Sequence, residues 1–386
     1  MKLFICLILT LLLFSCSEPR VEEGEKDDTV LVFESDKNAG LYGLSNFVES
    51  AEIHKLPLPD SINVAVVSSV ITIGSKLWVY DLPGKQILAF DLATNTLLYR
   101  IHNFGEGPLE YTGILDFDVN EADTLTIFSL GQRLVEFHQG TPVADFRFPV
   151  QTRGIAKVNS GIIGLFPYEG VGRLNSLTVY DKNGNKTGEL GEFIEEVKGG
   201  IPPTFKQRVN DSKVYLNDFS RNTIVELEKD EVVNEKKIEF DSPYDSVFLL
   251  YFIHFNNQSI VVVAKRSNAD EAIYTGYFKD GEHRATISSM VNDIDGSPIP
   301  GIFDAYNEDE NALIKVNTSE VASMIHSYYS DENMNKYFDQ EDGYYVFKDA
   351  QSMKVPADKF EAMRNQFLNE TAQEDNYLIL QKYKVK

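Results

Sequence analysis

Apolar and polar positions alternate in short runs through most of the chain. From residue 50 to residue 290, runs of five to seven residues rich in Val, Ile, Leu, Phe and Tyr are separated by short turns rich in Gly, Asn and Asp. Such runs are typical of β-strands, and no convincing amphipathic helical period occurs among them. The pattern predicts an all-β body.

The strands recur in units of similar design. The clearest unit is LWVYD, LPGK, QILAFD, LATN and TLLYRI at 77–101, and further copies occupy 124–148, 161–190, 213–240 and 259–287. The residues before the second turn of each unit, which are spaced by 47, 43, 47 and 51 positions, are Phe90, Phe137, Tyr180, Leu227 and Phe278. A period near 45 with three or four strands predicts the blades of a β-propeller, because each small sheet buries both faces against its neighbours.

The C-terminal part departs from this rhythm. A helical period runs over 318–338, with Thr318 as its N-cap, and a second runs over 356–370, with Pro356 in its first turn. YYVFKD between them and NYLILQKYKVK after them have the pattern of strands. We therefore expect a sixth blade interrupted by two helices and closed by an N-terminal strand at 51–58, which would remove the free sheet edges.

The N-terminus carries an export signal. Lys2 precedes an apolar run at 3–14, which would span about 18 Å as a helix and so falls short of the roughly 30 Å bilayer core. Residues 1–15 are therefore predicted to be a signal peptide. The run ends in L-F-S-C, which resembles the lipobox of bacterial lipoproteins and implies that Cys16 is acylated and anchors the chain to a membrane. An ordinary cleaved signal peptide with a chance cysteine is the alternative.

An acidic stretch, SEPRVEEGEKDD, follows Cys16, and we expect residues 16–40 to form a flexible tether to a propeller domain at 41–386. Acidic residues behind a lipidated cysteine also resemble the surface-export signals of Bacteroidota lipoproteins, whereas a plain solvated linker is the alternative. The expected location is the cell envelope, as an outer-membrane lipoprotein that is periplasmic or surface-exposed.

Charge and cysteine content exclude several classes of protein. With 36 basic and 59 acidic residues the net charge is −23, which would repel phosphate backbones, so no nucleic-acid partner is expected. The two cysteines are Cys6 and Cys16, so the predicted body offers no disulfide, thiolate metal site or cysteine nucleophile. The chain contains no P-loop, GxSxG or HExxH motif, and its six histidines stand singly. We therefore expect no metal and no cofactor.

Five segments support a family resemblance. The most specific is FGEGPLEYTGILDFDV at 104–119, and the others are LPLPDS, LWVYD, ILAFD and the C-terminal DNYLILQKYKVK. In these features the chain resembles the six-bladed β-propeller lipoproteins of Bacteroidota, a largely uncharacterised family, which implies a TolB/NHL-like propeller. The family's motif is G-R-G-P-G-E-Y, with Glu106 and Leu109 departing from it here. The matching residues are Gly105, Gly107, Pro108, Glu110 and Tyr111.

Two interpretations of this motif are open. The glycines and the proline would set a tight turn between blades, with Tyr111 as its anchor and Glu110 accepting backbone N–H bonds. Alternatively the motif contributes to a ligand surface, although Glu106 inverts the charge of the family's arginine. Propellers host both binding and catalysis, so the resemblance assigns no activity.

Charged residues near strand ends are the remaining candidates for a site. Four aspartates could gather near a propeller axis, where they would resemble the carboxylate clusters of calcium-bearing lactonases and glycoside-active propellers: Asp81, Asp116, Asp118 and Asp218. Chance placement competes with this interpretation, because acidic residues are abundant. Three arginines could bind a carboxylate-bearing ligand or form surface ion pairs: Arg133, Arg153 and Arg173.

Two functions follow. The first is a non-catalytic binding or interaction module for a protein partner or a nutrient-derived glycan. The second is a propeller hydrolase or lyase acting on sugar or lactone substrates through axial carboxylates, with or without calcium. Three or more carboxylates converging within about 5 Å at one end of the channel, with raised pKa values, would favour the enzyme.

Overall fold

The computed structural model describes residues 30–386 except 35–39, 149–151, 159–160, 166–173, 176, 182, 191–192, 195–204, 219–221, 230, 242–245, 268–269, 295, 297–302, 349 and 372–375. The predicted signal peptide and Cys16 lie outside the described residues. Within them, no helix is both long and apolar enough to cross a membrane.

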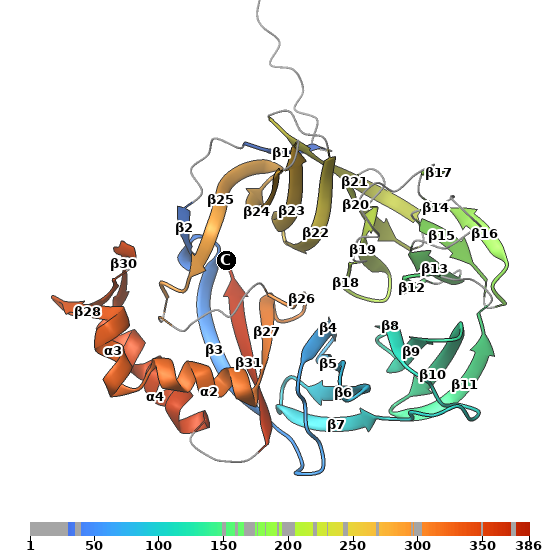
Figure 1. Ribbon diagram of the computed structural model, residues 1–386, viewed down its shortest axis with the longest axis horizontal. Coiled ribbons are helices and arrows are strands. Elements are labelled where there is room, and N and C mark those ends of the chain that lie inside the picture. The colour runs from blue at the N-terminus through green and yellow to red at the C-terminus, as the bar shows by residue number, and fades with distance from the viewer. Residues whose placement is uncertain are drawn as a thin grey trace, which may run out of the picture.

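Six antiparallel sheets surround a common axis, each with its first strand innermost (Figure 1). Blade 1 contains β4 (Val67–Ile73), β5 (Lys76–Asp81), β6 (Gln86–Asp91) and β7 (Thr96–Ile101). Blade 2 contains β8 (Ile114–Val119), β9 (Thr124–Ser129), β10 (Arg133–His138) and β11 (Thr141–Arg147). Blade 3 contains β12 (Gly154–Val158), β13 (Gly161–Leu165), β15 (Leu177–Tyr180) and β16 (Lys186–Glu189), beside the small pair β14 (Leu174–Asn175) and β17 (Phe193–Ile194). The all-β propeller prediction is confirmed.

The other half of the ring contains the longest strands, all four of blade 5 among them. Blade 4 contains β18 (Lys206–Arg208), β19 (Lys213–Asp218), β20 (Thr223–Glu228) and β21 (Glu231–Phe240). Blade 5 contains β22 (Ser246–Phe255), β23 (Gln258–Ser267), β24 (Asp270–Lys279) and β25 (Glu282–Val291). Blade 6 contains β26 (Ala305–Asn307), β27 (Ala312–Thr318), β31 (Tyr377–Val385) and β3 (Val48–Pro57), which follows the short 3-10 helix η1 (Leu44–Asn46). Apolar clusters fill the spaces between neighbouring blades.

The sequence repeat marks one structural position, a residue of the third strand that faces a β-bulge in the fourth strand of blades 1 to 5. Strand pairing shifts register immediately before each of the five repeating residues, between Ala89 and Phe90, Glu136 and Phe137, Val179 and Tyr180, Glu226 and Leu227, and Tyr277 and Phe278. A bulge bends its strand and increases the twist. A large apolar residue stands beside the bulge in each of these five units and packs between blades.

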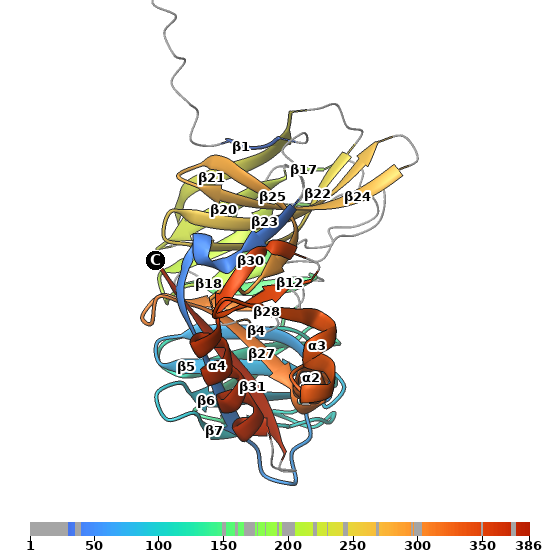
Figure 2. The same cartoon turned by 90° about the vertical axis from the view of Figure 1, so that its left-hand side faces the viewer.

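Blade 6 is closed as predicted, because β3 pairs antiparallel with the C-terminal β31. The expected helix over 318–338 is divided into α2 (Ser319–Tyr328) and α3 (Asp331–Tyr337), and the helix expected at 356–370 is α4 (Ala357–Thr371). Thr318 caps α2 by accepting the Val321 N–H. YYVFKD contributes β29 (Tyr344–Phe347) to a separate sheet with β28 (Phe338–Glu341) and β30 (Ala350–Pro356), outside the blade. The insertion packs beside blade 6 (Figure 2).

Two N-terminal strands extend blades 4 and 5 at their outer edges. β1 (Val30–Phe33) runs parallel to β21, and β2 (Gly40–Gly43) runs parallel to β25. The predicted tether of 16–40 is therefore wrong for residues 30–33, because Leu31 and Phe33 bury almost completely in the core between these blades. The described chain thus runs around the outside of blades 4, 5 and 6 before it enters blade 1 (Figure 1).

Candidate functional site

The FGEGPLEY motif connects blades 1 and 2. Glu110 accepts the Gly107 N–H at 2.7 Å, and the Tyr111 hydroxyl donates to the Lys85 carbonyl at 2.8 Å. A Cβ added to Gly105 would lie 2.1 Å from the Glu110 carboxylate, so this position accepts only glycine without rearrangement. These contacts give the motif a structural role, and its residues line neither of the two cavities described below.

Arg133 supports the same connection from blade 2. Its guanidinium forms an ion pair with Asp145 and donates to the Gly107 carbonyl at 3.0 Å. Asp145 also accepts the N–H of Leu109, which adopts a positive φ of 62°. The pair therefore holds a backbone conformation that a non-glycine residue rarely adopts. Among the other arginines, Arg153 is exposed before β12, and Arg173 lies outside the described residues.

Asp116 and Asp118 join the innermost strands of three blades. Asp118 accepts the Arg208 Nε–H at 2.8 Å and the Lys157 N–H at 2.6 Å. Asp116 accepts a hydrogen bond from the Lys206 ammonium at 2.7 Å and the Ile155 N–H at 2.8 Å. Since β8, β12 and β18 belong to blades 2, 3 and 4, the two carboxylates act as cross-links around the axis.

The two carboxylates differ in their pKa. Burial raises the pKa of Asp116 above its ordinary value, and Lys206 offsets only part of that effect. Burial acts on Asp118 in the same direction, but Arg208 and Lys206 outweigh it and lower its pKa. Asp118 is therefore held as the carboxylate by a guanidinium that is itself almost fully buried.

Asp81 and Asp218 lie elsewhere, each at the end of its blade's second strand. Asp81 is fully buried and accepts hydrogen bonds from the Gln86 side chain at 2.8 Å and the Val66 N–H at 3.3 Å. Asp218 is buried at the equivalent end of β19. Neither lines the axial cavity, so the four aspartates do not form one cluster. Within the described ranges, no group of three His, Cys, Asp or Glu side chains is arranged to hold a metal ion.

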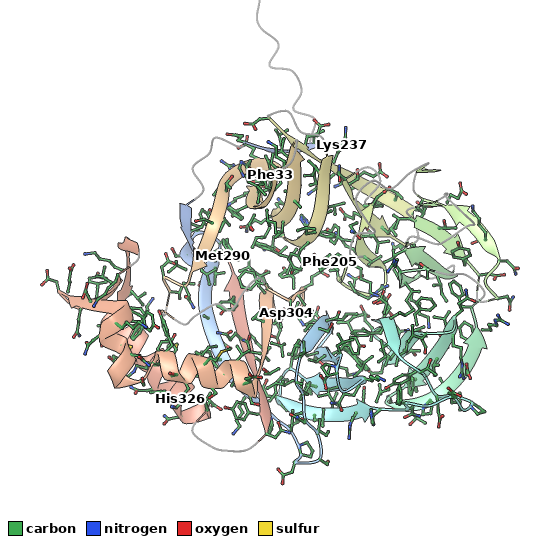
Figure 3. All side chains as sticks on the ribbon, viewed as in Figure 1. Phe33, Phe205, Lys237, Met290, Asp304 and His326 are labelled. Carbon is green, nitrogen blue, oxygen red and sulfur yellow. The ribbon has the colours of Figure 1, made fainter. Side chains whose placement is uncertain are left out.

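A cavity of about 350 Å³ lies on the axis. Asp116, Lys206, Tyr251 and Asp304 contribute its polar lining, and Figure 3 places Asp304 and Phe205 near the centre of the ring. Asp304 is engaged by Lys315 at 2.9 Å and by the Val316 N–H at 2.7 Å. Each axial carboxylate in the described part of the cavity therefore already has a cationic partner.

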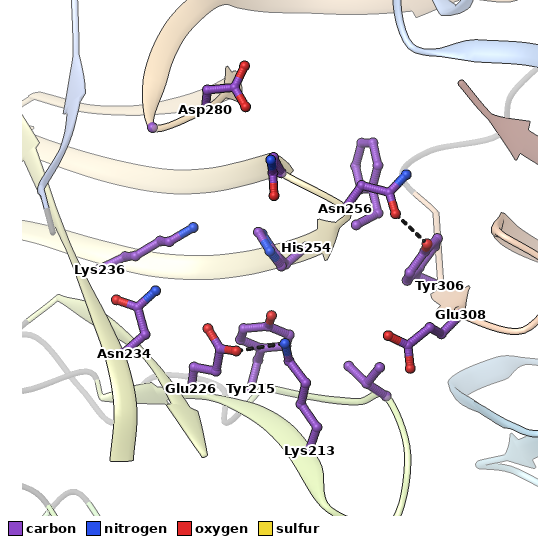
Figure 4. A pocket seen from close by; sticks show the side chains of 14 residues that line it. Lys213, Tyr215, Glu226, Asn234, Lys236, His254, Asn256, Asp280, Tyr306 and Glu308 are labelled. Carbon is purple, nitrogen blue, oxygen red and sulfur yellow. Dashed lines mark hydrogen bonds and ion pairs between the residues drawn. The ribbon is translucent and has the colours of Figure 1, made fainter. Parts of the chain in front are cut away.

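A larger cavity, of about 490 Å³, lies between blades 4 and 5 and extends to blade 6 (Figure 4). On blade 4, Tyr215, Glu226 and Asn234 stand directly opposite one another on β19, β20 and β21 and form a polar row. The other polar lining residues are Lys213 and Lys236 from blade 4, His254, Asn256, Asn257 and Asp280 from blade 5, and Tyr306 and Glu308 from blade 6. We call this cavity the inter-blade pocket.

Aromatic rings and one ion pair dominate the inter-blade pocket. The Lys213 ammonium lies 2.7 Å from Glu226 and 5.2 Å from the ring centre of Tyr215. The His254 ring centre lies 4.9 Å from that of Tyr215, and its Nδ1 is 2.8 Å from the Ser259 hydroxyl. At the other end, the Tyr306 hydroxyl donates to the Asn256 side chain at 3.1 Å.

Both rings at the centre of the pocket are neutral at neutral pH. Burial, followed by the nearby Lys236 and Lys213 charges, lowers the pKa of His254 to about 3. Burial also raises the pKa of Tyr215 to about 12. The pocket therefore presents uncharged hydrogen-bonding rings beside an internally neutralised lysine.

The inter-blade pocket was not predicted from the sequence, although its signal was present in the strand pattern. At the same register in blade 1 the row consists of Trp78, Ala89 and Tyr99, and the first two are fully buried. In blade 4 Glu226 takes the place of Ala89, immediately before the shift in strand register. A charged residue in the apolar run TIVEL was thus the available clue.

Comparisons place the chain in a family. A family model described as 6-bladed beta-propeller, DUF5128, matches residues 20–292. A Bacteroides fragilis protein named for its expected export is 15% identical, with a TM-score of 0.60 over 93% of this chain and 100% of that one. A Bacteroides vulgatus member of the DUF4221 family is 11% identical, with a TM-score of 0.46 over 88% and 97% of the two chains. No curated protein matches. Because the family model covers more than half of its length, the chain belongs to the DUF5128 family of six-bladed β-propellers.

Proposed function

We propose that this chain is a binding propeller of the cell envelope that holds a small, neutral, polyhydroxylated ligand, such as a glycan fragment, in the inter-blade pocket. One observation carries the proposal. A polar row of Tyr215, Glu226 and Asn234 faces an open cavity at a register where blade 1 is sealed by Trp78 and Tyr99.

The ligand class follows from the lining. His254, which is half-buried and packs against Tyr215, offers its ring for the C–H surface of a sugar, and the asparagine amides can both donate to and accept from hydroxyl groups. Because Glu226 neutralises Lys213, the remaining charged lining residues are one lysine and two carboxylates, at Lys236, Asp280 and Glu308. That balance, in a chain of net charge −23, disfavours an anionic ligand.

The location rests on separate support. The lipobox-like L-F-S-C and the acidic residues behind Cys16 favour a lipid-anchored protein of the outer membrane, and the similar Bacteroides fragilis protein is named for export. Mass spectrometry of the mature chain tests this part, because a diacylglycerol-modified Cys16 is expected at the N-terminus. An N-terminus at another residue, or an unmodified Cys16, would contradict it.

Calorimetric titration of the full-length chain with a panel of neutral and acidic oligosaccharides of two to six sugar units tests the ligand site. We expect a neutral member to bind and Glu226→Gln to weaken its affinity about tenfold, which corresponds to about 1.4 kcal/mol. Glu136→Gln is the matched control, because Glu136 occupies the same register in blade 2 and pairs with Lys157. If no saccharide binds, or if both variants weaken binding equally, the proposal fails.

The hydrolase or lyase alternative requires uncommitted carboxylates at the axis. Asp116, Asp118 and Asp304 are each paired with a cation, so the contacts favour a structural role for them. The same saccharide panel tests catalysis if cleavage products are measured. Products that form with the native chain and disappear in Asp116→Asn would favour the enzyme over the binding module.

A further inference from the structure

The N-terminal strand β1 contacts blades 4 and 5, the two blades that form most of the inter-blade pocket. It adds to the outer edge of blade 4, where Val30 pairs with Lys237 and Phe33 pairs with Phe240. The Asp241 N–H donates to the Phe33 carbonyl at 3.0 Å and extends this pairing. Figure 3 shows Phe33 and Lys237 at the outer rim of the ring. By its hydrogen bonds, β1 therefore belongs to blade 4.

The segment also contacts blade 5. The Phe33 ring stacks on Phe240 of blade 4 at 5.0 Å and also meets the edge of Phe278 of blade 5 at 5.0 Å. The Glu34 N–H donates to His283 Nδ1 at 3.2 Å. A Cβ added to Gly276 on β24 would lie 2.5 Å from the Phe33 ring, so glycine there makes room for it.

These contacts flank the pocket walls directly. Lys236, which lines the pocket, is the chain neighbour of Lys237, which pairs with Val30. On blade 5, the lining residue Asp280 lies in the turn between Phe278 and His283, the two residues that Phe33 touches. Blades otherwise meet largely through side-chain packing, so a segment bound to both can set their separation.

We propose that residues 30–34 form a clasp that fixes the spacing of the two pocket walls, and that Phe33 is a positioning residue for the ligand site. The importance of that spacing for binding rests on the proposed function. The clasp itself is a property of the empty protein and is tested without a ligand.

Distance measurement between spin labels on the two walls tests the clasp. Val233→Cys on blade 4, next to the lining residue Asn234, and Asn257→Cys on blade 5, which itself lines the pocket, are at exposed positions. They are introduced into the chain with Cys6→Ser and Cys16→Ser, which leaves no other thiol. We expect one narrow distance distribution, which broadens and shifts to longer distances in Phe33→Ala and in Gly276→Ala. Val32→Ala, an exposed position on the same strand, is the control and should leave the distribution unchanged.

Hydrogen exchange separates opening of the clasp from general unfolding. In Phe33→Ala we expect faster exchange in the turn at 279–283 and unchanged exchange in blade 1. Distance distributions identical to those of the native chain would overturn the proposal, as would exchange that rises equally in blades 1 and 5, because Phe33 would then be an ordinary core residue. A failure of saccharide binding alone leaves these measurements intact, so the two proposals fail independently.

Discussion

The space between blades 1 and 2 and the space between blades 4 and 5 are built on the same strand register, yet the first is filled at this register and the second contains the inter-blade pocket. In blade 1, Lys76 at the start of the second strand reaches across to Asp123 of blade 2. In blade 4, Lys213 occupies the same strand position but pairs with Glu226 of its own blade. Because Lys213 pairs within its own sheet, it forms no ion pair with blade 5 at this position, and the space there is left for the pocket.

Blade 2 shows that the glutamate alone does not make a site. Glu136 stands at the register of Glu226, but Lys157 of blade 3 pairs with it at 2.5 Å and the Thr126 hydroxyl lies at 3.4 Å. The charge is thus used to join two blades. A glutamate at this register joins two blades when its lysine partner comes from the next blade, as in blade 2. It leaves a pocket when the partner comes from its own blade, as in blade 4.

The largest expected effect comes from opening the closed space. Trp78→Ala should lower the free energy of unfolding by about 4 kcal/mol, because a fully buried indole leaves a cavity that its neighbours fill only in part. Denaturant unfolding measures this. Asn234→Ala in the open row should change stability by no more than about 0.5 kcal/mol. Similar losses in the two variants would show that both spaces are packed alike.

Buried and open ion pairs should differ almost as strongly. Arg208→Met leaves the fully buried Asp118 without its guanidinium and should cost about 3 kcal/mol of unfolding free energy. Lys213→Met, in the partly exposed pair with Glu226, should cost less than about 1 kcal/mol. Chemical denaturation at neutral pH measures both variants. An equal cost would mean that the pair in the pocket is structural rather than available to a ligand.

Local patterns in the sequence predicted much of the fold. The apolar residue beside each bulge repeats, so Phe90 and its counterparts revealed the blades, and the alternation near 51–58 identified the closing strand. The strand at 30–33 was overlooked because four apolar residues, VLVF, stand within an acidic segment. Only the partner Phe240 and the gap at Gly276 explain why Phe33 is buried.

The sites were harder to predict because their partners are distant in sequence. Asp116 and Asp118 could be identified as axial residues, but Lys206 and Arg208, which neutralise them, lie 90 positions away. The inter-blade pocket could not be predicted for the same reason, because the residues that line it come from distant parts of the sequence. Glu136 and Glu226 look alike in their strands, and only the folded arrangement shows that one is bridged to the next blade.

Lowering the pH should reduce the free energy of unfolding through His254, which lines the inter-blade pocket. Its pKa of about 3 in the folded chain lies below the ordinary 6.5, so the unfolded chain binds more protons between these values. Stability attributable to His254 is therefore present above pH 6.5 and is lost as the pH falls toward 3, by at most about 1.4 kcal/mol per pH unit.

His254→Gln should flatten this part of the stability profile, which denaturant unfolding at a series of pH values measures. His102→Gln, which removes an exposed histidine after β7, is the control and should leave the slope unchanged. A native slope retained in His254→Gln would show that the histidine is not protected from protons by burial.

Only a small change in stability is expected when the polar row of blade 4 is replaced by the residues of blade 1. Combining Glu226→Ala with Asn234→Tyr gives blade 4 the small and aromatic residues of Ala89 and Tyr99 while Tyr215 remains. Buried apolar area is gained, but Lys213 loses its partner, so unfolding free energy should change by no more than about 1 kcal/mol. Saccharide binding in the calorimetric assay should disappear. If binding survives a filled pocket in a stably folded variant, the ligand site lies elsewhere on the propeller, and the open space between blades 4 and 5 is only a packing difference.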